Sequence, residues 1–309
     1  MQVKTIKKTI EAKLNAWLET ITDEKLRADV KNNVLVSGGS ITSLLLGETV
    51  NDYDIYLQDR SVLLRLTHYY VDPIEDAHVW DGHNKEKMLS EYEGSSASDN
   101  NYYICSLRNL QSDQVKIFID NSNIGGMKIQ TALEEAKEGE QAKEVKPYRL
   151  SFLSPNAMSL TDDIQIVVRF HGEPKDIHKT FDFIHATNYF TFKSGVVTNI
   201  PALHSIMSRQ LVYQGSLYPL TSVIRAKKFI KRNWNIHAGE YLKMIFQISL
   251  LDLTNLDVLE EQLVGIDVAY FAVLISALRK HKASEPNFII SAEYMNTLVD
   301  RIFNGVEEE

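Results

Sequence analysis

The chain of 309 residues has little cysteine, proline and glycine, with 1 Cys, 7 Pro and 14 Gly. Its single cysteine, Cys105, excludes an internal disulfide and every zinc module built from several cysteines. The scarcity of proline and glycine, together with 44% hydrophobic residues, argues against disorder. We expect a chain that buries a sizeable core in one large or two smaller domains.

Long hydrophobic stretches are also missing. The longest mostly apolar run, Val268 to Leu278, falls well short of the roughly 20 residues that a membrane span needs. The charged start, Met1 to Lys8, is not followed by the apolar region of a secretion signal. We therefore expect a soluble protein of the cytoplasm, where the thiol of Cys105 stays reduced.

Several common catalytic signatures are absent as well. The sequence has no Walker A loop, no Rossmann glycine fingerprint and no nucleophile elbow, so P-loop NTPases, dinucleotide oxidoreductases and hydrolases lose their main support. None of the 9 histidines forms a His-Glu-x-x-His motif or pairs with the cysteine at zinc-ligand spacing. The net charge of −8 disfavours unspecific attraction of nucleic acid to the whole surface, but a local basic face is compatible with binding.

The first 71 residues show a regular order of apolar patterns. Spacings of three to four residues predict helices, and alternation or short apolar runs predict strands. The expected elements are two helices within residues 1–31, a strand over 33–37, a helix over 40–46 with Ser40 as its N-cap, a strand over 53–57 and a helix over 61–71. This order favours an α/β architecture.

The rest of the chain predicts an insertion and a change of fold type. Residues 72–101 are polar and predict a surface loop, residues 102–107 and 114–119 a hairpin, and residues 134–144 a solvated helix or linker. Further strands are expected over 148–153, 163–170 and 180–192, and helices from Pro201 onward. We therefore predict a domain over residues 1–198 with a mixed sheet, flanking helices and an insertion at about 72–146, and a helical domain over 199–309.

One stretch combines glycines with paired carboxylates. The predicted strand over residues 33–37 leads into Gly38, Gly39 and Ser40 at a helix start, where backbone N–H groups and a hydroxyl can approach a phosphate. Asp52 and Asp54 follow at the next strand, and the period of two places both carboxylates on one face. Because like charges repel, this pair favours a divalent cation such as Mg²⁺, which also binds triphosphate oxygens.

In these residues the sequence resembles the nucleotidyltransferase superfamily related to DNA polymerase β. The resemblance implies transfer of a nucleoside monophosphate from an NTP such as ATP to an acceptor hydroxyl, with two Mg²⁺ ions held by Asp52 and Asp54. It also implies that Gly38, Gly39 and Ser40 contact the triphosphate. The close match covers about 25 residues, and a looser match extends over about 150.

The resemblance further implies a third carboxylate on a neighbouring strand. We place it at Asp182, in Phe181-Asp182-Phe183, where alternation predicts two core phenylalanines and a carboxylate on the opposite face. Asp120, which follows the apolar segment 115–119, is the alternative.

A basic segment supplies candidate contacts to phosphates or to an acceptor. Arg225 and Lys228 share one stripe of a predicted helix with Arg232, and either the triphosphate tail or an RNA end, for example of a tRNA, fits such a helix. A protein side-chain hydroxyl or a small molecule are alternative acceptors. The segment 216–232 is similar to phage-borne or mobile-element members of the superfamily. A binding module without turnover, such as a toxin–antitoxin component or a regulator, is the second hypothesis.

Overall fold

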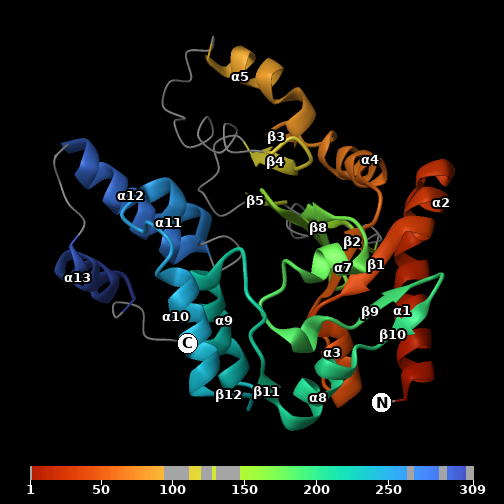
Figure 1. The fold of residues 1–309 in the computed structure, drawn as a ribbon. Coiled ribbons are helices and arrows are strands. Elements are labelled where there is room, and N and C mark those ends of the chain that lie inside the picture. Colours follow the sequence, from red (N-terminus) through yellow and green to blue (C-terminus); the bar gives the residue numbers. More distant parts are fainter. Residues whose placement is uncertain are drawn as a thin grey trace, which may run out of the picture. The chain divides into compact units, whose positions relative to one another are not determined.

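The computed structural model describes residues 2–93, 111–119, 127–129, 147–262, 268–284 and 291–303. Within these ranges the chain forms two compact units. Unit 1 runs to Met207 except for Asp182–Ile184, which join the residues from Ser208 onward in unit 2. Figure 1 shows the elements of both units.

Unit 1 begins with the two expected helices. Helix α1 spans Val3–Leu18 and α2 spans Glu24–Asn33. Asp23 caps α2 by accepting a hydrogen bond from the backbone N–H of Leu26 at 2.9 Å, which satisfies one of the free donors of its first turn.

The centre of unit 1 is an eight-stranded mixed sheet with the strand order β10-β9-β1-β2-β8-β7-β6-β5. The strands are β1 (Val34–Ser37), β2 (Tyr53–Leu57), β5 (Met127–Lys128), β6 (Leu150–Ser154), β7 (Ala157–Leu160), β8 (Ile164–His171), β9 (Tyr189–Thr191) and β10 (Gly195–Val197). The β2–β8 pair is parallel, whereas β1 pairs antiparallel with both β2 and β9. The predicted mixed α/β fold is therefore confirmed (Figure 1).

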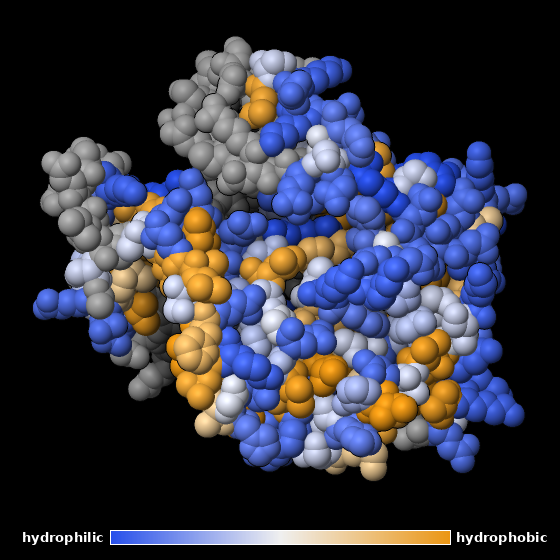
Figure 2. All heavy atoms as spheres, in the orientation of Figure 1, coloured by the Kyte–Doolittle hydropathy of each residue, from blue (hydrophilic) through white to orange (hydrophobic). Residues whose placement is uncertain are grey.

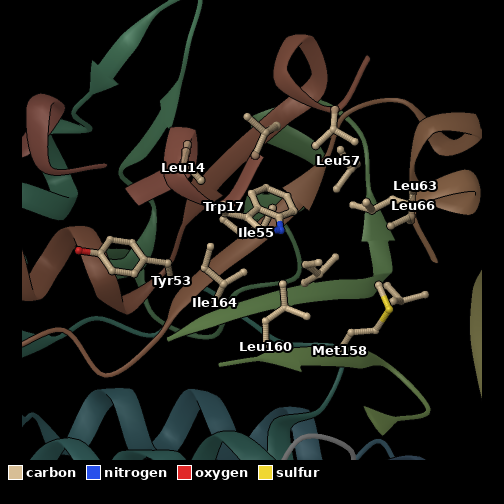
Figure 3. Close-up of a cluster of buried hydrophobic side chains, with 14 of the residues drawn as sticks. Leu14, Trp17, Tyr53, Ile55, Leu57, Leu63, Leu66, Met158, Leu160 and Ile164 are labelled. Carbon is tan, nitrogen blue, oxygen red and sulfur yellow. The ribbon is translucent and has the colours of Figure 1, made fainter. Parts of the chain in front are cut away.

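The main hydrophobic core lies on one face of this sheet. Alternate residues of β2, among them Ile55 and Leu57, pack with Trp17 of α1 and with side chains of α4 (Arg60–Val71), as Figure 3 shows. Burying each such side chain contributes about 1.5–3 kcal/mol. The Trp17 indole N–H also donates to the Tyr70 hydroxyl at 3.0 Å, so this polar atom has a partner in the core.

A smaller cluster covers the opposite face of the sheet. Leu35 of β1 and Tyr56 of β2 pack there against Ile177 of the short helix α7 (Pro174–His178). Period-two alternation along β2 places Asp54 on this second face, because it lies two residues before Tyr56. The main core thus supports the strands, and the second face carries the candidate carboxylate.

The polar segment after α4 is not the continuous loop that its composition predicts. It contains β3 (Ala77–Asp81) and α5 (Lys85–Glu93), and β3 pairs antiparallel with β4 (Val115–Ile119). The expected hairpin partner of β4 was residues 102–107, which lie outside the described residues, as does the acidic segment 134–144. Composition misleads here because Ala77 and Trp80 are buried between polar neighbours.

The predicted strand over residues 180–192 is wrong for most of its length. Only Tyr189–Thr191 form a strand, β9, and Ile184–Ala186 form a 3₁₀ turn. The alternating phenylalanines have a different cause: Phe181 packs with Tyr56 at 5.9 Å between ring centroids, whereas Phe183 packs with Tyr213 at 6.0 Å. The two phenylalanines thus have the spacing of a strand in the sequence, although each is buried by a separate contact.

Unit 2 consists mainly of helices, as expected for the residues after Pro201. Its helices are α9 (Pro219–Ile230), α10 (Ala238–Ile248), α11 (Leu256–Gln262), α12 (Val268–Ser284) and α13 (Ala292–Phe303), while α8 (Ile200–Ser208) lies almost entirely in unit 1. Leucines of α11, α12 and α13 form the core of unit 2 with Leu220 and Ile224 of α9 packed against them. A two-stranded pair, β11 (Gln210–Leu211) with β12 (Asn235–Ile236), was not predicted.

Candidate active site

The turn between β1 and α3 (Gly39–Leu46) brings a glycine against a carboxylate. Gly38 has φ 97° and ψ −151°, a conformation that side chains rarely adopt, and an ideal Cβ on it would lie 2.8 Å from Oδ2 of Asp54. Gly38 therefore lets the chain pass directly beside this carboxylate. Its N–H donates to the carbonyl of Ala186 at 3.1 Å, so this amide is already used within the protein.

The two carboxylates of the Asp-x-Asp pair have different surroundings. Asp54 lies within β2, half-buried, opposite Gln165 of the parallel strand β8. Asp52 precedes the strand and is exposed. The pair thus combines one carboxylate fixed by a central strand with one at the strand's solvent-exposed start.

Gly39 and Ser40 form the first turn of α3. The position of a Cβ on Gly39 meets no atom within 4 Å, so the space beside this residue is open. Ser40 is 2% exposed, and its hydroxyl has no hydrogen-bond partner among the described residues. The helix begins at Gly39 with Gly38 as its N-cap, so the prediction of Ser40 as the N-cap is wrong. The buried hydroxyl is a donor at the positive end of a helix.

A serine–histidine pair, missed in the sequence, fixes the strand that leads into this turn. Ser37 Oγ lies 2.9 Å from His178 Nε2 and donates to the carbonyl of Asn188, also at 2.9 Å. Because that bond uses the hydroxyl hydrogen, Ser37 accepts from the Nε2–H of a neutral imidazole. Burial lowers the pKa of His178 to about 4, which is consistent with this neutral form. The order strand-Ser-Gly-Gly was the one available signal for Ser37.

Asp182 belongs to unit 2 and is held there by two side chains. Its Oδ2 pairs with Arg225 at 2.9 Å, and its Oδ1 accepts from the Ser216 hydroxyl at 2.8 Å. The residue is 4% exposed, and burial raises the pKa of its carboxyl while Arg225 and Ser216 oppose the rise. It does not lie on a strand with Phe181 and Phe183 on the other face, because these residues form no strand. Both oxygens of the Asp182 carboxylate therefore have partners within the protein.

The basic helix is α9, and its cations differ in exposure. Arg225 is half-buried by its pairing with Asp182, whereas Lys228 is exposed. The predicted stripe of Arg225, Lys228 and Arg232 is therefore not one uniform binding surface. Lys228 and Arg232 are the members of the stripe that face solvent.

The described residues form no metal site with three protein ligands. Among the described residues, no three His, Cys, Asp or Glu side chains gather closely enough to hold a metal ion. Asp120, the alternative third carboxylate, lies outside the described residues. The structure thus brings Gly38 together with Asp54, and Asp182 together with Arg225. In the same described residues, no helix is long and apolar enough to cross a membrane.

The fold and the turn define the class of this protein. It is a mixed α/β protein in which a glycine turn follows one central strand and a carboxylate lies on the adjacent strand. Similar solved structures are CCA-adding enzymes. The Thermotoga maritima CCA-adding enzyme complexed with tRNA_CCA is 14% identical at a TM-score of 0.36, with 90% of this chain and 57% of that chain covered. A CCA-adding enzyme with CTP is 13% identical at a TM-score of 0.38, with 95% and 62% covered. The chain thus spans about three fifths of the length of these proteins.

The profile of the Gabija anti-defense 2 family protein matches residues 8–209, and the chain belongs to this family. The match includes the glycine turn, Asp52, Asp54 and Asp182, and it ends before α9. No curated protein matches the chain.

Proposed function

We propose that this protein is a divalent-metal-dependent nucleotidyltransferase that moves a nucleoside monophosphate from an NTP to an acceptor hydroxyl. The observation that carries this proposal is the approach of the Asp54 carboxylate to Gly38, 2.8 Å from where a side chain would begin, at the turn that contains Ser40. The buried hydroxyl of Ser40, which has no hydrogen-bond partner in the described part of the chain, supports it, because a phosphate oxygen would supply an acceptor.

The residues at this turn fit a hard cation. Asp52 and Asp54 offer carboxylate oxygens, the donors that Mg²⁺ prefers, and they would hold up to two ions. Mg²⁺ supplies positive charge that stabilises the transferring phosphoryl group. Asp182 as a further ligand stays a prediction, since it would have to give up contacts with Arg225 or Ser216.

The chain's own groups would orient the triphosphate. Gly39 leaves open space for a phosphate, Ser40 would donate its hydroxyl, and the positive end of α3 favours an anion there. Gly38 would contribute by lacking a side chain and not as a donor, because its N–H already donates to the carbonyl of Ala186. Ser37 and His178 would hold β1 in place behind the turn.

The family suggests the biological role, and α9 suggests the acceptor. We propose that the transfer counteracts the Gabija defence, as the family's description implies. An RNA end, for example of a tRNA, is the proposed acceptor, because exposed Lys228 and Arg232 of the basic segment suit a phosphate backbone. Arg225 would act indirectly through Asp182.

The test is a labelling reaction with purified protein, Mg²⁺, each α-³²P-NTP in turn, and total RNA and protein of the host cell. We expect label on one acceptor class with the wild type and a loss of at least about a hundredfold with D52N/D54N. The control is D176N, because Asp176 is a surface carboxylate of unit 1 that pairs with Lys179 at 2.9 Å. The same variants are compared for protection of a phage against Gabija.

A second candidate, nucleotide or partner binding without turnover, is favoured by the absence of a third carboxylate beside Asp54 among the described residues. In that case no label is transferred, yet Mg²⁺-dependent binding of the nucleotide is intact in the wild type and lost in D52N/D54N. Absence of nucleotide binding in the wild type would refute both nucleotidyl transfer and nucleotide binding without turnover, and it would leave partner binding.

A further inference from the structure

One row of side chains crosses the sheet of unit 1 on the face that carries Asp54. Register pairing places one residue from each of five neighbouring strands opposite the next: Asp54 of β2, Gln165 of β8, Ser159 of β7, Phe152 of β6 and Lys128 of β5. We call these five residues the sheet row. Because neighbouring strands lie about 4.8 Å apart, the row extends about 19 Å from Asp54 to Lys128.

All five side chains lie on the face opposite the main core. For every member except Phe152, both chain neighbours pack in or against the main core, and for Phe152 this holds for Leu153. Figure 3 shows three of these core neighbours, Met158, Leu160 and Ile164. Since side chains alternate along a strand, the sheet row is directed to the second face.

The sheet row offers several kinds of polar group. Lys128 is exposed, and the other four residues are half-buried. The Gln165 amide donates to the Ser159 hydroxyl at 3.4 Å. Among the described residues, the Gln165 carbonyl oxygen has no hydrogen bond, the Phe152 ring has no aromatic contact and Lys128 forms no ion pair. The row thus differs from the apolar band that Figure 2 shows over α10 of unit 2.

A short single strand of nucleic acid matches this order of groups. The ring of Phe152 can stack on any base, because every base has a flat π-face. Lys128 provides a positive charge for a phosphate, and the amide and hydroxyl of Gln165 and Ser159 can bond to base edges or ribose hydroxyls. A stacked strand advances about 3.4 Å per nucleotide, so the row is long enough for about six nucleotides.

The charges of the second face favour phosphate at the outer end of the row. The one carboxylate of the sheet row, Asp54, lies at the opposite end from Lys128. Arg149 directly precedes β6 on the same face, because Leu150 after it is a core residue. The turn between β7 and β8, which bonds to the Arg149 backbone, carries Asp162 and Asp163, and these carboxylates reduce its effect. Lys128 is therefore the cation on which binding depends.

We propose that the sheet row binds the hydroxyl end of a single-stranded RNA, with the terminal ribose near Asp54, a base on Phe152 and a phosphate at Lys128. The direction of the strand rests on the proposed function, since the acceptor hydroxyl must lie beside the carboxylate that would hold the metal. All five residues belong to unit 1 and lie within the family match over residues 8–209. The acceptor end is thus assigned to unit 1, and contact with the basic segment of unit 2 is not required.

The binding test uses the full chain and a fluorescein-labelled RNA of about six nucleotides, and it measures fluorescence anisotropy without NTP or Mg²⁺. F152L keeps an apolar side chain but removes the ring, and we expect it to increase the dissociation constant by at least about tenfold. K128E reverses the charge and should increase it by at least about fivefold. The control is K8E, because Lys8 is an exposed cation of α1, whose buried side chains pack on the other face of the sheet. Circular dichroism spectra show that the variants fold.

The length of the RNA tests its position. In a series from about two to ten nucleotides, the affinity of the wild type should increase up to about six nucleotides and then stay constant. K128E should remove the gain from the last nucleotides of this range and leave the binding of the shortest RNAs unchanged, because these do not reach Lys128 from Asp54. An equal loss at every length would contradict the proposed direction.

Absence of RNA binding, or binding that F152L and K128E leave unchanged, would overturn the proposal. The α-³²P-NTP reaction with the same RNA separates this failure from a failure of the proposed function. Label that reaches the RNA equally well in the wild type and both variants refutes the sheet row as the acceptor site and supports the transferase. RNA binding that both variants weaken, without transfer of label, supports the sheet row and counts against the transferase.

Discussion

Gly38 and Gly39 are neighbours in the sequence, but they meet different surroundings. Gly38 has a positive φ and touches Asp54, whereas Gly39 is helical and faces open space. The first glycine is therefore required by the fold, while the second is dispensable for folding. If a phosphate occupies the open space, the second glycine is required by the ligand.

The two glycines can be separated by single alanine substitutions. G38A is expected to lower the free energy of unfolding by about 1–2 kcal/mol from the backbone alone, and it also displaces Asp54. G39A is expected to leave stability unchanged or raise it by up to about 1 kcal/mol, because alanine is the better helix former. Both reduce Mg²⁺-dependent nucleotide binding, measured by titration calorimetry. Full binding by G39A would show that no phosphate lies beside Gly39.

At the scale of elements, the sequence predicts those whose pattern reflects a single environment. β1, β2 and α3 were placed within one residue because the apolar side chains of each short run pack in the interior, and those of β1 and β2 do so on both faces of the sheet. The segment 180–192 could not be predicted, because Phe181 packs in unit 1 and Phe183 in unit 2. Gly38 and Asp54 were proposed from their spacing and lie side by side, whereas the partners of Asp182, Ser216 and Arg225, are distant from it in sequence.

Substitutions in the ion pair between Asp182 and Arg225 test whether Asp182 is a structural partner of Arg225 or a metal ligand. R225M leaves a buried carboxylate without its cation and is expected to lower the free energy of unfolding by about 3 kcal/mol. D182N/R225M is expected to lose less than the sum of the single variants in denaturant titrations. The exposed pair Asp176–Lys179 provides the control, because K179M is expected to leave the free energy of unfolding nearly unchanged.

The same variants report on the metal. If Asp182 serves only as the structural partner of Arg225, D182N and R225M should have equal effects on Mg²⁺-dependent nucleotide binding. If D182N abolishes that binding while R225M preserves it, Asp182 is a metal ligand, as its place in the sequence first suggested.

At the scale of the whole molecule, folding encloses two neutral imidazoles next to the candidate site. His178 holds Ser37, and the backbone carbonyl of His185 accepts a hydrogen bond from Thr42 of α3 at 3.0 Å. Burial lowers the pKa of each to about 4, compared with about 6.5 in the unfolded chain. The unfolded state therefore binds protons at a pH where the folded state does not.

This difference fixes the sign of the pH dependence. The stabilisation from the two neutral histidines is complete above pH 6.5 and is lost as the pH falls toward about 4. Asp182 acts in the opposite direction, because burial raises the pKa of its carboxyl. The informative quantity is therefore the difference between variants rather than the total slope.

We expect H178Q to be less stable than the wild type at pH 7 by about 1 kcal/mol, since it perturbs the contact with Ser37, and to lose less stability between pH 6.5 and 5. Urea titrations at a series of pH values measure both effects. An H178Q curve parallel to the wild type would mean that His178 is not held neutral by burial, and the tautomer assigned to the Ser37 contact would lose its basis.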